Sequence, residues 1–478
     1  MRAAMATSAA SALVLGLPQK KCHNVYVEPN PNDPVRKVAL VETPGTLARE
    51  DFAGAIRGMW QADGHASGKV LVAQGTTLST FDPATNTDGS LTGTIAGTDW
   101  GDFAFTESEG LGLFNGQPYV SDGSAIAAAS DPAFADLLTD AGVSSFTSVA
   151  TIGQRGLLTY GPRFAFTDVL DVGSTSALSY YTAESSPDNL VAGRVVGELY
   201  YLFGSQTIEP WAQTGNSDDP FSLQPGMTQQ VGCFCRDGII GADNTLFFID
   251  EAGNPRRLAQ GSSPILNPED PWVTDLFRLA GAANIRGMTY QDRAHVFVGW
   301  RTPLGCVIYD VLTLQWHTRG TLNTDTWRWT AVVTAGTRTF VGDADGVFDE
   351  LSRDYTSEHM PDTSTMGTEI VREFTAIAPG LPNRIAINTV RLESAKGVGL
   401  AAGQGSDPVI RMRFSVDGGN TWSPWRDRSL GVQGRYDQPT IWRRCGRAGR
   451  QDVVFQFSKS DPVKEAYLGV VINEDEAA

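Results

Sequence analysis

The sequence is poor in the features of disulfide-stabilised, membrane-spanning and zinc-binding proteins. Its five cysteines are an odd and scattered set, and the closest pair, Cys233 and Cys235, has one intervening residue where a zinc knuckle needs two to four. We therefore expect buried thiols in a reducing compartment. No apolar run reaches the about 18 residues that a membrane helix requires.

Catalytic and cofactor-binding motifs are lacking as well. The five histidines show no metal-ligand spacing, and the chain has no Walker A sequence, no nucleophile elbow and no glycine-rich dinucleotide loop. The sequence therefore offers no candidate catalytic, cofactor-binding or metal-ligating residue. Asp343, Asp345 and Asp349 faintly resemble a calcium loop but lack the rest of the EF-hand pattern, so we interpret them as a turn between two strands and keep a bound Ca²⁺ as the minor alternative. The sequence predicts a protein that is not an enzyme.

Positive charge is also scarce. The chain has 37 lysines and arginines against 54 aspartates and glutamates, which gives a net charge of −17. Nucleic-acid binding depends on clustered cations, so a protein this acidic binds DNA poorly and repels a duplex that passes close by. We expect DNA to move past such a protein without adhering to it.

Short β-strand patterns bounded by glycine, asparagine and aspartate are abundant. From about Val70 onward, strand pairs recur, and Asn115-Gly116 is the strongest hairpin signal because both turn positions need a positive φ. Helical patterns are limited to Ser130–Gly142 and Glu269–Gly281. Strand pairs at this density indicate four-stranded blades, so the sequence predicts an all-β protein with a β-propeller of about six or seven blades.

A polar, turn-rich stretch at residues 356–368 separates the propeller pattern from a second run of strands. We expect three units: a partly extended N-terminal arm at 1–50, the propeller at 51–365, and a β-sandwich-like domain at 366–478. The first residues, MRAAMATSAASALVLGLPQKK, resemble a weak signal peptide, but their apolar run is short and Pro-Gln-Lys-Lys is a poor cleavage context. Secretion is therefore the weaker interpretation.

The stretch FSVDGGNTWSPW, Phe414–Trp425, has the Ser-x-Asp-x-Gly-x-Thr-Trp pattern known as an Asp box in sialidases and other propeller enzymes. Ser415 and Asp417 can hydrogen-bond turn amides, Gly419 permits a positive φ, and Trp422 packs beneath the turn. Sialidase chemistry would also need a nucleophile, an acid/base carboxylate and an arginine cluster. Because the pattern occurs once and outside the propeller, we interpret it as a structural turn. A carbohydrate-binding or glycoside-hydrolysing propeller stays as the alternative function.

The C-terminal domain is locally rich in arginine. Arg411 and Arg413 share one face of a strand, since side chains alternate along it, and Trp442 beside Arg443 offers a stacking surface. One interpretation is an ordinary solvated strand face. A second is a surface that docks onto an acidic neighbour, such as another copy of the chain. DNA binding is the third and weakest interpretation, because the overall negative charge opposes it. The candidate interface residues are Arg411, Arg413, Arg443, Arg444 and Arg447.

The order of the motifs resembles the packaged-DNA stabilisation proteins, also called tail hub or nozzle proteins, of short-tailed phages (podophages). The most specific stretch is TAESSPDNLVAGRVVGELYYLFGSQTIEPWAQTGNSDDPF at residues 182–221. The segments HNVYVEPN…KVALVETPGTL, CVIYDVLTLQWHTRG, VGDADGVFDELS and RFSVDGGNTWS…WRRCGRAGR are also similar, in order, over about residues 20–470. The residues that carry the central motif are Glu184, Pro187, Asp188, Phe203, Gly204, Thr207, Glu209 and Trp211.

The resemblance implies a structural virion protein without catalytic residues or cofactors. Members of the family form a ring, usually of six copies, below the portal and adaptor rings. There they continue the DNA channel, retain packaged DNA, permit its ejection, and anchor tailspikes, fibres or a needle. The implied partners are copies of the same chain, connector proteins and tail appendages, while viral DNA passes through the lumen without specific binding. Assembly in the host bacterial cytoplasm and a location in the virion tail are implied as well.

Overall fold

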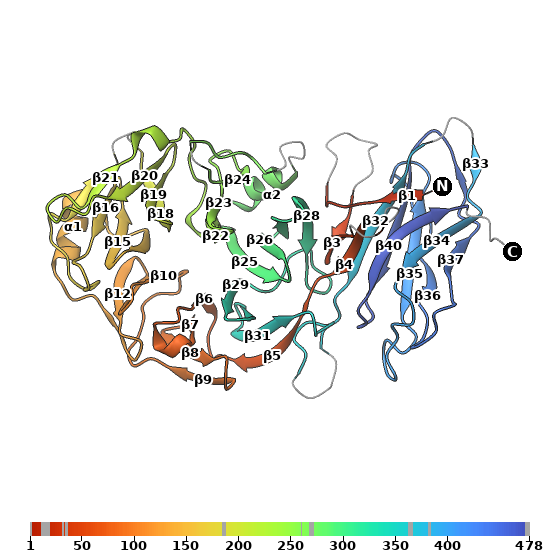
Figure 1. The fold of residues 1–478 in the computed structure, drawn as a ribbon, viewed down its shortest axis with the longest axis horizontal. Coiled ribbons are helices and arrows are strands. Elements are labelled where there is room, and N and C mark those ends of the chain that lie inside the picture. The colour runs from red at the N-terminus through yellow and green to blue at the C-terminus, as the bar shows by residue number, and fades with distance from the viewer. Residues whose placement is uncertain are drawn as a thin grey trace.

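The computed structural model describes residues 2–10, 20–30, 33, 37–183, 188–259, 261–266, 272–361, 367–380 and 384–473. Two β-rich bodies lie beside each other, a ring of blades and a sandwich, and both ends of the described chain lie in the sandwich (Figure 1). The predicted all-β class, with a propeller followed by a β-sandwich, is confirmed.

The propeller consists of short antiparallel meanders. Within the described residues, six separate sheets form blades, five with four strands and one with three. The first five, in chain order, contain β6 (Ile56–Trp60), β7 (Val70–Gln74), β8 (Thr77–Asp82) and β9 (Thr87–Ser90); β10 (Asp102–Phe105), β11 (Gly110–Phe114), β12 (Gln117–Ser121) and β13 (Ile126–Ala128); β14 (Ser148–Ile152), β15 (Arg155–Tyr160), β16 (Arg163–Phe166) and β17 (Tyr180–Thr182); β18 (Leu190–Val196), β19 (Leu199–Gly204), β20 (Ile208–Gln213) and β21 (Phe221–Leu223); and β22 (Ile240–Ala242), β23 (Thr245–Ile249) and β24 (Pro255–Arg257). Asn115 and Gly116 join β11 to β12 with φ of 52° and 70°, the positive values that a two-residue hairpin turn needs.

The sixth separate blade closes the ring with a strand from the N-terminal part of the chain. It contains β29 (Ala331–Ala335), β30 (Arg338–Gly342), β31 (Val347–Ser352) and β5 (Gly45–Asp51). β5 pairs antiparallel with β31, so that Thr46 lies opposite Leu351. Since β5 precedes the other propeller strands in the chain and β31 follows them, the ring is closed by two segments that are distant in sequence.

A further meander, which lies in the ring of the propeller between β24 and β29, connects the propeller to the sandwich (Figure 1). It contains β25 (Arg286–Asp292), β26 (His295–Thr302), β27 (Gly305–Asp310) and β28 (Gln315–Arg319). β28 pairs in parallel with β2 (Cys22–His23), and β2 pairs antiparallel with β32 (Arg372–Ala378). One hydrogen-bonded sheet therefore runs from the meander into the sandwich.

The sandwich combines strands from both ends of the chain. One layer contains β32, β39 (Val453–Lys459), β35 (Val409–Ser415) and β36 (Arg426–Ser429), and the other contains β3 (Val25–Pro29), β4 (Val38–Glu42), β40 (Ala466–Ile472), β34 (Thr389–Ser394) and β37 (Thr440–Arg443). β33 (Ile385–Ala386) and β38 (Arg447–Ala448) form a separate two-stranded ribbon. β1 (Arg2–Met5) pairs with β32 and with β40, so it joins the two layers at one edge.

The core of the sandwich lies between these layers. Phe374, Phe457, Tyr467 and Trp442 are fully buried there, and small residues of the N-terminal segment, among them Ala3, pack against the same cluster. Segments before residue 52 thus contribute strands to both bodies. The residue limits expected for the arm, the propeller and the sandwich stay a prediction.

Helices are few, as expected from the sequence. The structure has α1 (Ala133–Ala141), α2 (Trp272–Ala280) and four short 3-10 turns, η1 (Ala66–Gly68), η2 (Pro225–Met227), η3 (Arg236–Gly238) and η4 (Ala282–Asn284), among the described residues. Gly142 and Gly281 follow the two α-helices with φ of 68° and 78°, the left-handed conformation that glycine adopts at little cost. Both helices lie inside the ranges that the sequence predicts.

The five cysteines are buried and unpaired, as the sequence predicts. Burial raises the pKa of the Cys22 thiol to about 12, so the reactive thiolate form is suppressed at neutral pH. A separate finding concerns membranes: among the described residues, no helix combines the length and the apolar character needed to span one.

Candidate functional site

The central motif of the 182–221 stretch organises one turn of a propeller blade. Asp188 Oδ2 accepts hydrogen bonds from the amides of Gln206, at 2.7 Å, and Thr207, at 3.3 Å. Gly204 precedes this turn, and a Cβ at that position would lie 2.4 Å from Asp188 Oδ2. The aspartate and the glycine therefore form a matched pair, because the carboxylate occupies the space that a larger residue would need.

The other described residues of the motif are buried in the same blade. Phe203 packs at 5.3 Å from Phe248, ring centre to ring centre, and Trp211 donates from Nε1 to Glu209 Oε2 at 3.4 Å. Thr207 is buried as well. The motif therefore builds the interior of the blade and offers no exposed binding group at these positions. Glu184 and Pro187, the first residues of the motif, lie outside the described residues.

The Asp-box-like turn is held by its own side chains. Ser415 Oγ donates to Asp417 Oδ1 at 2.6 Å and accepts the amide of Gly419 at 2.8 Å. Asp417 also accepts the amide of Thr421 at 2.8 Å and its hydroxyl at 2.6 Å. Hydrogen bonds from Ser415 and Thr421 lower the pKa of Asp417 to about 2. The polar groups of the pattern are thus engaged within the turn, and Gly418 and Gly419 have the positive φ that it requires.

Trp422 and Trp425 of this turn interleave with two of the predicted interface arginines. Along β35, Ile410 and Met412 enter the core, while Arg411 and Arg413 lie on the opposite face. The Arg413 guanidinium lies 4.5 Å from the Trp422 ring centre and 4.7 Å from that of Trp425. The Arg411 guanidinium lies 4.9 Å from Trp425. Such cation–π contacts hold the long side chains in place and favour a fixed cationic surface. We call these four side chains the Arg–Trp ladder.

The remaining interface arginines are exposed at the neighbouring end of β37 and on β38: Arg443, Arg444 and Arg447. Arg426 of β36 reaches the same region, because its guanidinium donates to the carbonyls of Arg443 and Arg444. The expected stacking role of Trp442 is wrong. This ring is fully buried, donates from Nε1 to the Arg426 carbonyl at 2.7 Å and packs against Phe457, because its alternation on β37 directs it into the core.

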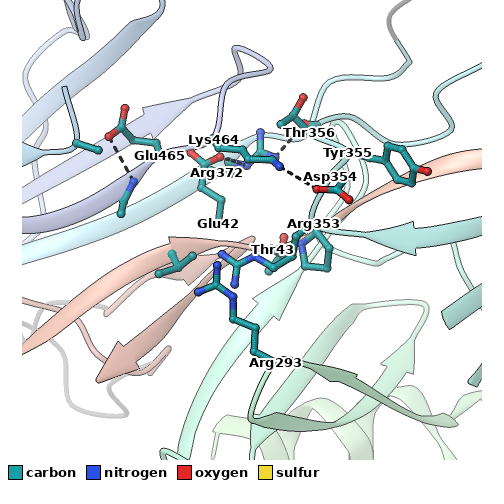
Figure 2. Close-up of a pocket in the computed structure, with 14 residues that line it drawn as sticks. Glu42, Thr43, Arg293, Arg353, Asp354, Tyr355, Thr356, Arg372, Lys464 and Glu465 are labelled. Carbon is teal, nitrogen blue, oxygen red and sulfur yellow. Dashed lines mark hydrogen bonds and ion pairs between the residues drawn. The ribbon is translucent and has the colours of Figure 1, made fainter. Parts of the chain in front are cut away.

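A polar cleft of about 480 Å³, which the sequence did not indicate, lies where propeller and sandwich meet. We call it the junction cleft. Its propeller side includes Arg293, in the turn between β25 and β26, and Arg353 to Thr356, which follow β31. Its sandwich side includes Glu42, Arg372 and Lys464 to Ala466. Figure 2 shows the Arg293 side chain extending toward Arg353, and the Lys464–Asp354 ion pair of 3.2 Å between the two sides.

The floor of the junction cleft contains a buried charge cluster. Glu42 lies 2.6 Å from Lys459 Nζ and 3.0 Å from Arg372 Nε, and it accepts the Tyr467 hydroxyl at 3.0 Å. Burial raises the pKa of Glu465, at the edge of this cluster, to about 8. The carboxylate of Glu42 is thus shared by Lys459 and Arg372, while burial favours the neutral form of Glu465.

No group of three or more histidine, cysteine, aspartate and glutamate side chains within the described residues could hold a metal ion. The cleft, the ladder and the turns are thus arrangements of cations, aromatic rings and hydrogen bonds. Arrangements of this kind bind partners or stabilise the fold.

Comparisons with known proteins identify both bodies of the chain. The family model described as Bacteriophage P22 Gp10, beta-propeller, matches residues 22–257, and the model described as Bacteriophage P22 Gp10, beta-sandwich, matches residues 373–473. No curated protein sequence matches the chain.

Two solved structures are similar to this chain at low sequence identity and low TM-score. The computationally designed Ika8 protein is 13% identical, with a TM-score of 0.36 over 73% of this chain and 96% of that one. PorZ, a bacterial surface component of the type-IX secretion system of Porphyromonas gingivalis, is 12% identical, with a TM-score of 0.39 over 81% of this chain and 46% of that one.

The two family matches follow the order of the chain, and each lies largely within the body that its description names: the first spans the blades from β6 to β24, and the second spans the C-terminal strands of the sandwich. The first contains the 182–221 motif, and the second contains the Asp-box-like turn and the Arg–Trp ladder. The chain belongs to the packaged-DNA stabilisation, or tail hub, family of structural phage proteins.

Proposed function

We propose that this chain forms a cyclic ring, with six copies as the expected number, in the tail of a short-tailed phage. The ring lies below the portal and adaptor proteins, continues the DNA channel, retains packaged DNA and permits its ejection. It also anchors tailspikes, fibres or a needle, and it assembles in the bacterial cytoplasm. The match of the propeller and the sandwich to the two P22 Gp10 models is the observation that carries this proposal.

The distribution of charge supports the proposal. Residues 1–366 contain 22 lysines and arginines against 41 aspartates and glutamates, whereas residues 367–478 contain 15 against 13. A channel bordered by acidic surface gives DNA no adhesive phosphate contacts, so the genome slides without specific binding. The sandwich, by contrast, has the positive charge needed to meet an acidic neighbour.

The proposed contact with that neighbour is the arginine surface of the sandwich. The Arg–Trp ladder holds Arg411 and Arg413 in fixed positions, which reduces the conformational entropy lost when a carboxylate pairs with them. Arg443, Arg444 and Arg447 extend the surface. We assign its partner as the acidic propeller of the next copy in the ring.

Electron microscopy of the purified chain and of the virion tests the ring. Cyclic particles around a central channel, at the position below the portal, are expected. A chain that stays monomeric at high concentration and is absent from the virion tail would refute the proposal.

The docking surface is tested by charge reversal. The double variant Arg444→Glu and Arg447→Glu is expected to weaken association of the copies at least about tenfold, because like charges then face each other. Lys37→Glu, an exposed lysine of the sandwich outside this surface, is the matched control. Association of the wild type should also weaken between 0.05 and 0.5 M salt (roughly a threefold change in screening length). If the wild type and the double variant associate equally, the arginine surface is not the contact between copies. The proposed ring would then have to form through another surface.

The alternative function, glycan binding or hydrolysis, has no support from the geometry of the Asp-box-like turn. The hydroxyl of Ser415 and the carboxylate of Asp417 are engaged by groups of the turn itself. Their arrangement explains the sequence pattern without a ligand.

A further inference from the structure

The junction cleft brings together cations that are far apart in the chain. Arg293 and Arg353 come from the propeller, and Lys464 comes from the sandwich. The cleft opens between the two bodies, and side chains of both form its walls (Figure 2). A ligand held by these three side chains would therefore connect propeller to sandwich.

The arginine pair is incompletely neutralised. Arg353 Nη1 donates to the Tyr26 hydroxyl at 2.6 Å and lies 3.4 Å from Asp292 Oδ2, an oxygen that also accepts the Tyr26 hydroxyl at 2.9 Å. Arg293 is exposed and has no hydrogen bond or ion pair to another described residue. Its backbone has a φ of 57°, unusual for a residue with a side chain, and this conformation places the guanidinium beside the cleft. Two neighbouring guanidinium groups repel each other unless an anion lies between them.

The floor of the cleft adds to the positive potential. Arg372 and Lys459 share the single carboxylate of Glu42. Glu465, which is buried and lines the cleft, has an Oε2 atom without a hydrogen-bond partner in the described part of the chain. Burial raises the pKa of this carboxyl to about 8, which favours the protonated form, and a protonated carboxyl can donate a hydrogen bond.

We propose that the junction cleft binds a tetrahedral oxyanion of the phosphate class between Arg293 and Arg353 of the propeller and Lys464 of the sandwich. Guanidinium groups form paired, charge-assisted hydrogen bonds with phosphate oxygens. Lys464, which lies 3.2 Å from Asp354 across the cleft, adds a point charge from the opposite wall. Bound in this position, the anion fastens the sandwich to the propeller. The inference rests on the cleft itself and is independent of the proposed role in the tail.

Binding of inorganic phosphate to the full chain, measured by calorimetry at constant ionic strength, tests the proposal. Phosphate is expected to bind the wild type and to raise its unfolding temperature, whereas chloride and acetate at equal ionic strength do neither. Arg293→Gln should weaken phosphate binding at least about tenfold, because a charge-assisted hydrogen bond is lost. Since Arg293 is exposed and unpartnered among the described residues, this variant should unfold like the wild type when phosphate is absent.

Two further variants sharpen the result. Lys464→Met should also weaken binding, since the ligand is held from both bodies, and Arg435→Gln, an exposed arginine elsewhere in the sandwich, should leave it unchanged.

A short single-stranded oligonucleotide serves as the second probe. Arg293-dependent binding of free phosphate would support a free ion, and Arg293-dependent binding of the oligonucleotide alone would assign the oxyanion to nucleic acid. Binding of neither probe at 10 mM, or equal binding by wild type and Arg293→Gln, would overturn the proposal.

Discussion

The imidazole of His295 lies between two carboxylates that come from different parts of the fold. Its Nδ1 is 2.8 Å from Asp310 Oδ2 on β27, and its Nε2 is 3.1 Å from Glu28 Oε2 on β3. Burial of the ring lowers its pKa, but the hydrogen bonds to Asp310 and Glu28 outweigh this effect, so the pKa is raised above 6.5. His295 thus links the β25–β28 meander to β3 of the sandwich, and its raised pKa favours the protonated ring in this position.

His295→Gln should therefore destabilise the protein more at acidic than at alkaline pH. Removal of one partner of a buried ion pair costs about 3 kcal/mol. Because the folded-state pKa is raised, this stabilisation is fully present below about pH 6.5 and is lost as the pH rises through the folded value. Urea unfolding of both proteins at pH 6 and pH 9 should show a difference that shrinks at the higher pH.

His65→Gln provides a control of opposite sign. Burial lowers the pKa of His65, which contacts Ser121 Oγ at 3.1 Å. The contribution of this neutral ring is lost as the pH falls below about 6.5, so the difference between His65→Gln and the wild type should shrink toward acid. A stability difference for His295→Gln that stays constant from pH 6 to pH 9 would contradict the charged contact.

At the residue scale, the family motif also depends on the close contact between Gly204 and Asp188. Gly204→Ala would place a Cβ 2.4 Å from Asp188 Oδ2, which is far inside contact distance. We expect a loss of about 2–3 kcal/mol in the free energy of unfolding, since buried overpacking is costly. Gly226→Ala is the control, because a Cβ at Gly226 meets no atom within 4 Å. Chemical unfolding measures both variants, and equal stability of the two would contradict a structural role for the pair.

At the scale of elements, closure of the propeller depends on β5. Glu350 of β31 accepts hydrogen bonds from Arg49 of β5, at 2.6 and 2.9 Å, and from Arg338 of β30, at 2.6 and 3.0 Å. Hydrogen bonds and ion pairs from Arg338 and Arg49 outweigh the burial of Glu350 and lower its pKa. Three strands of the closing blade are therefore tied to one carboxylate.

Glu350→Ala should increase local unfolding of the closing blade more than local unfolding of the other blades. It leaves two largely buried guanidinium groups without their partner, which we expect to cost about 3 kcal/mol. Amide hydrogen exchange should rise in β5 and β31 and remain unchanged in β10–β13. Glu198→Ala, at an exposed turn between β18 and β19, should have no such effect. Uniform exchange across all blades would argue against closure at β5.

At the scale of the whole molecule, the two ends of the chain share one core. β1 lies between β32 and β40, and Ala3, Ala6 and Ala9 pack in the sandwich core. The propeller is therefore inserted, in sequence, between two parts of the sandwich. The continuous sheet formed by β28, β2 and β32 joins the propeller to the sandwich, so we expect the stability of the two bodies to be coupled.

Removal of residues 1–21 should destabilise the sandwich selectively. The deletion removes β1 and exposes apolar surface of the core. The edges of β32 and β40 that pair with β1 then lose their partner strand. We expect faster amide exchange in β32 and β40, with the blade formed by β10–β13 as the internal reference. A truncated chain with unchanged exchange in these strands would show that β1 is dispensable.

Local features of this protein were determined by its sequence alone. The Asn115-Gly116 turn, the two helices and the Asp-box-like turn form as predicted, because each depends on backbone preferences and hydrogen bonds within a few residues. The motif order was likewise sufficient to identify the family. Alternation along β35 correctly placed Arg411 and Arg413 on one face.

Tertiary structure alone decided which distant segments meet. Closure by β5, the position of β1, the burial of Trp442 and the meeting of Arg293 with Lys464 at the junction cleft all join residues that no local pattern relates. A strand pattern indicates that a segment forms a β-strand and which of its faces is apolar. Several other strands of the chain would suit that strand equally well as neighbours in a sheet. The choice among them depends on the packing of the whole chain, since only there is the buried apolar surface completed.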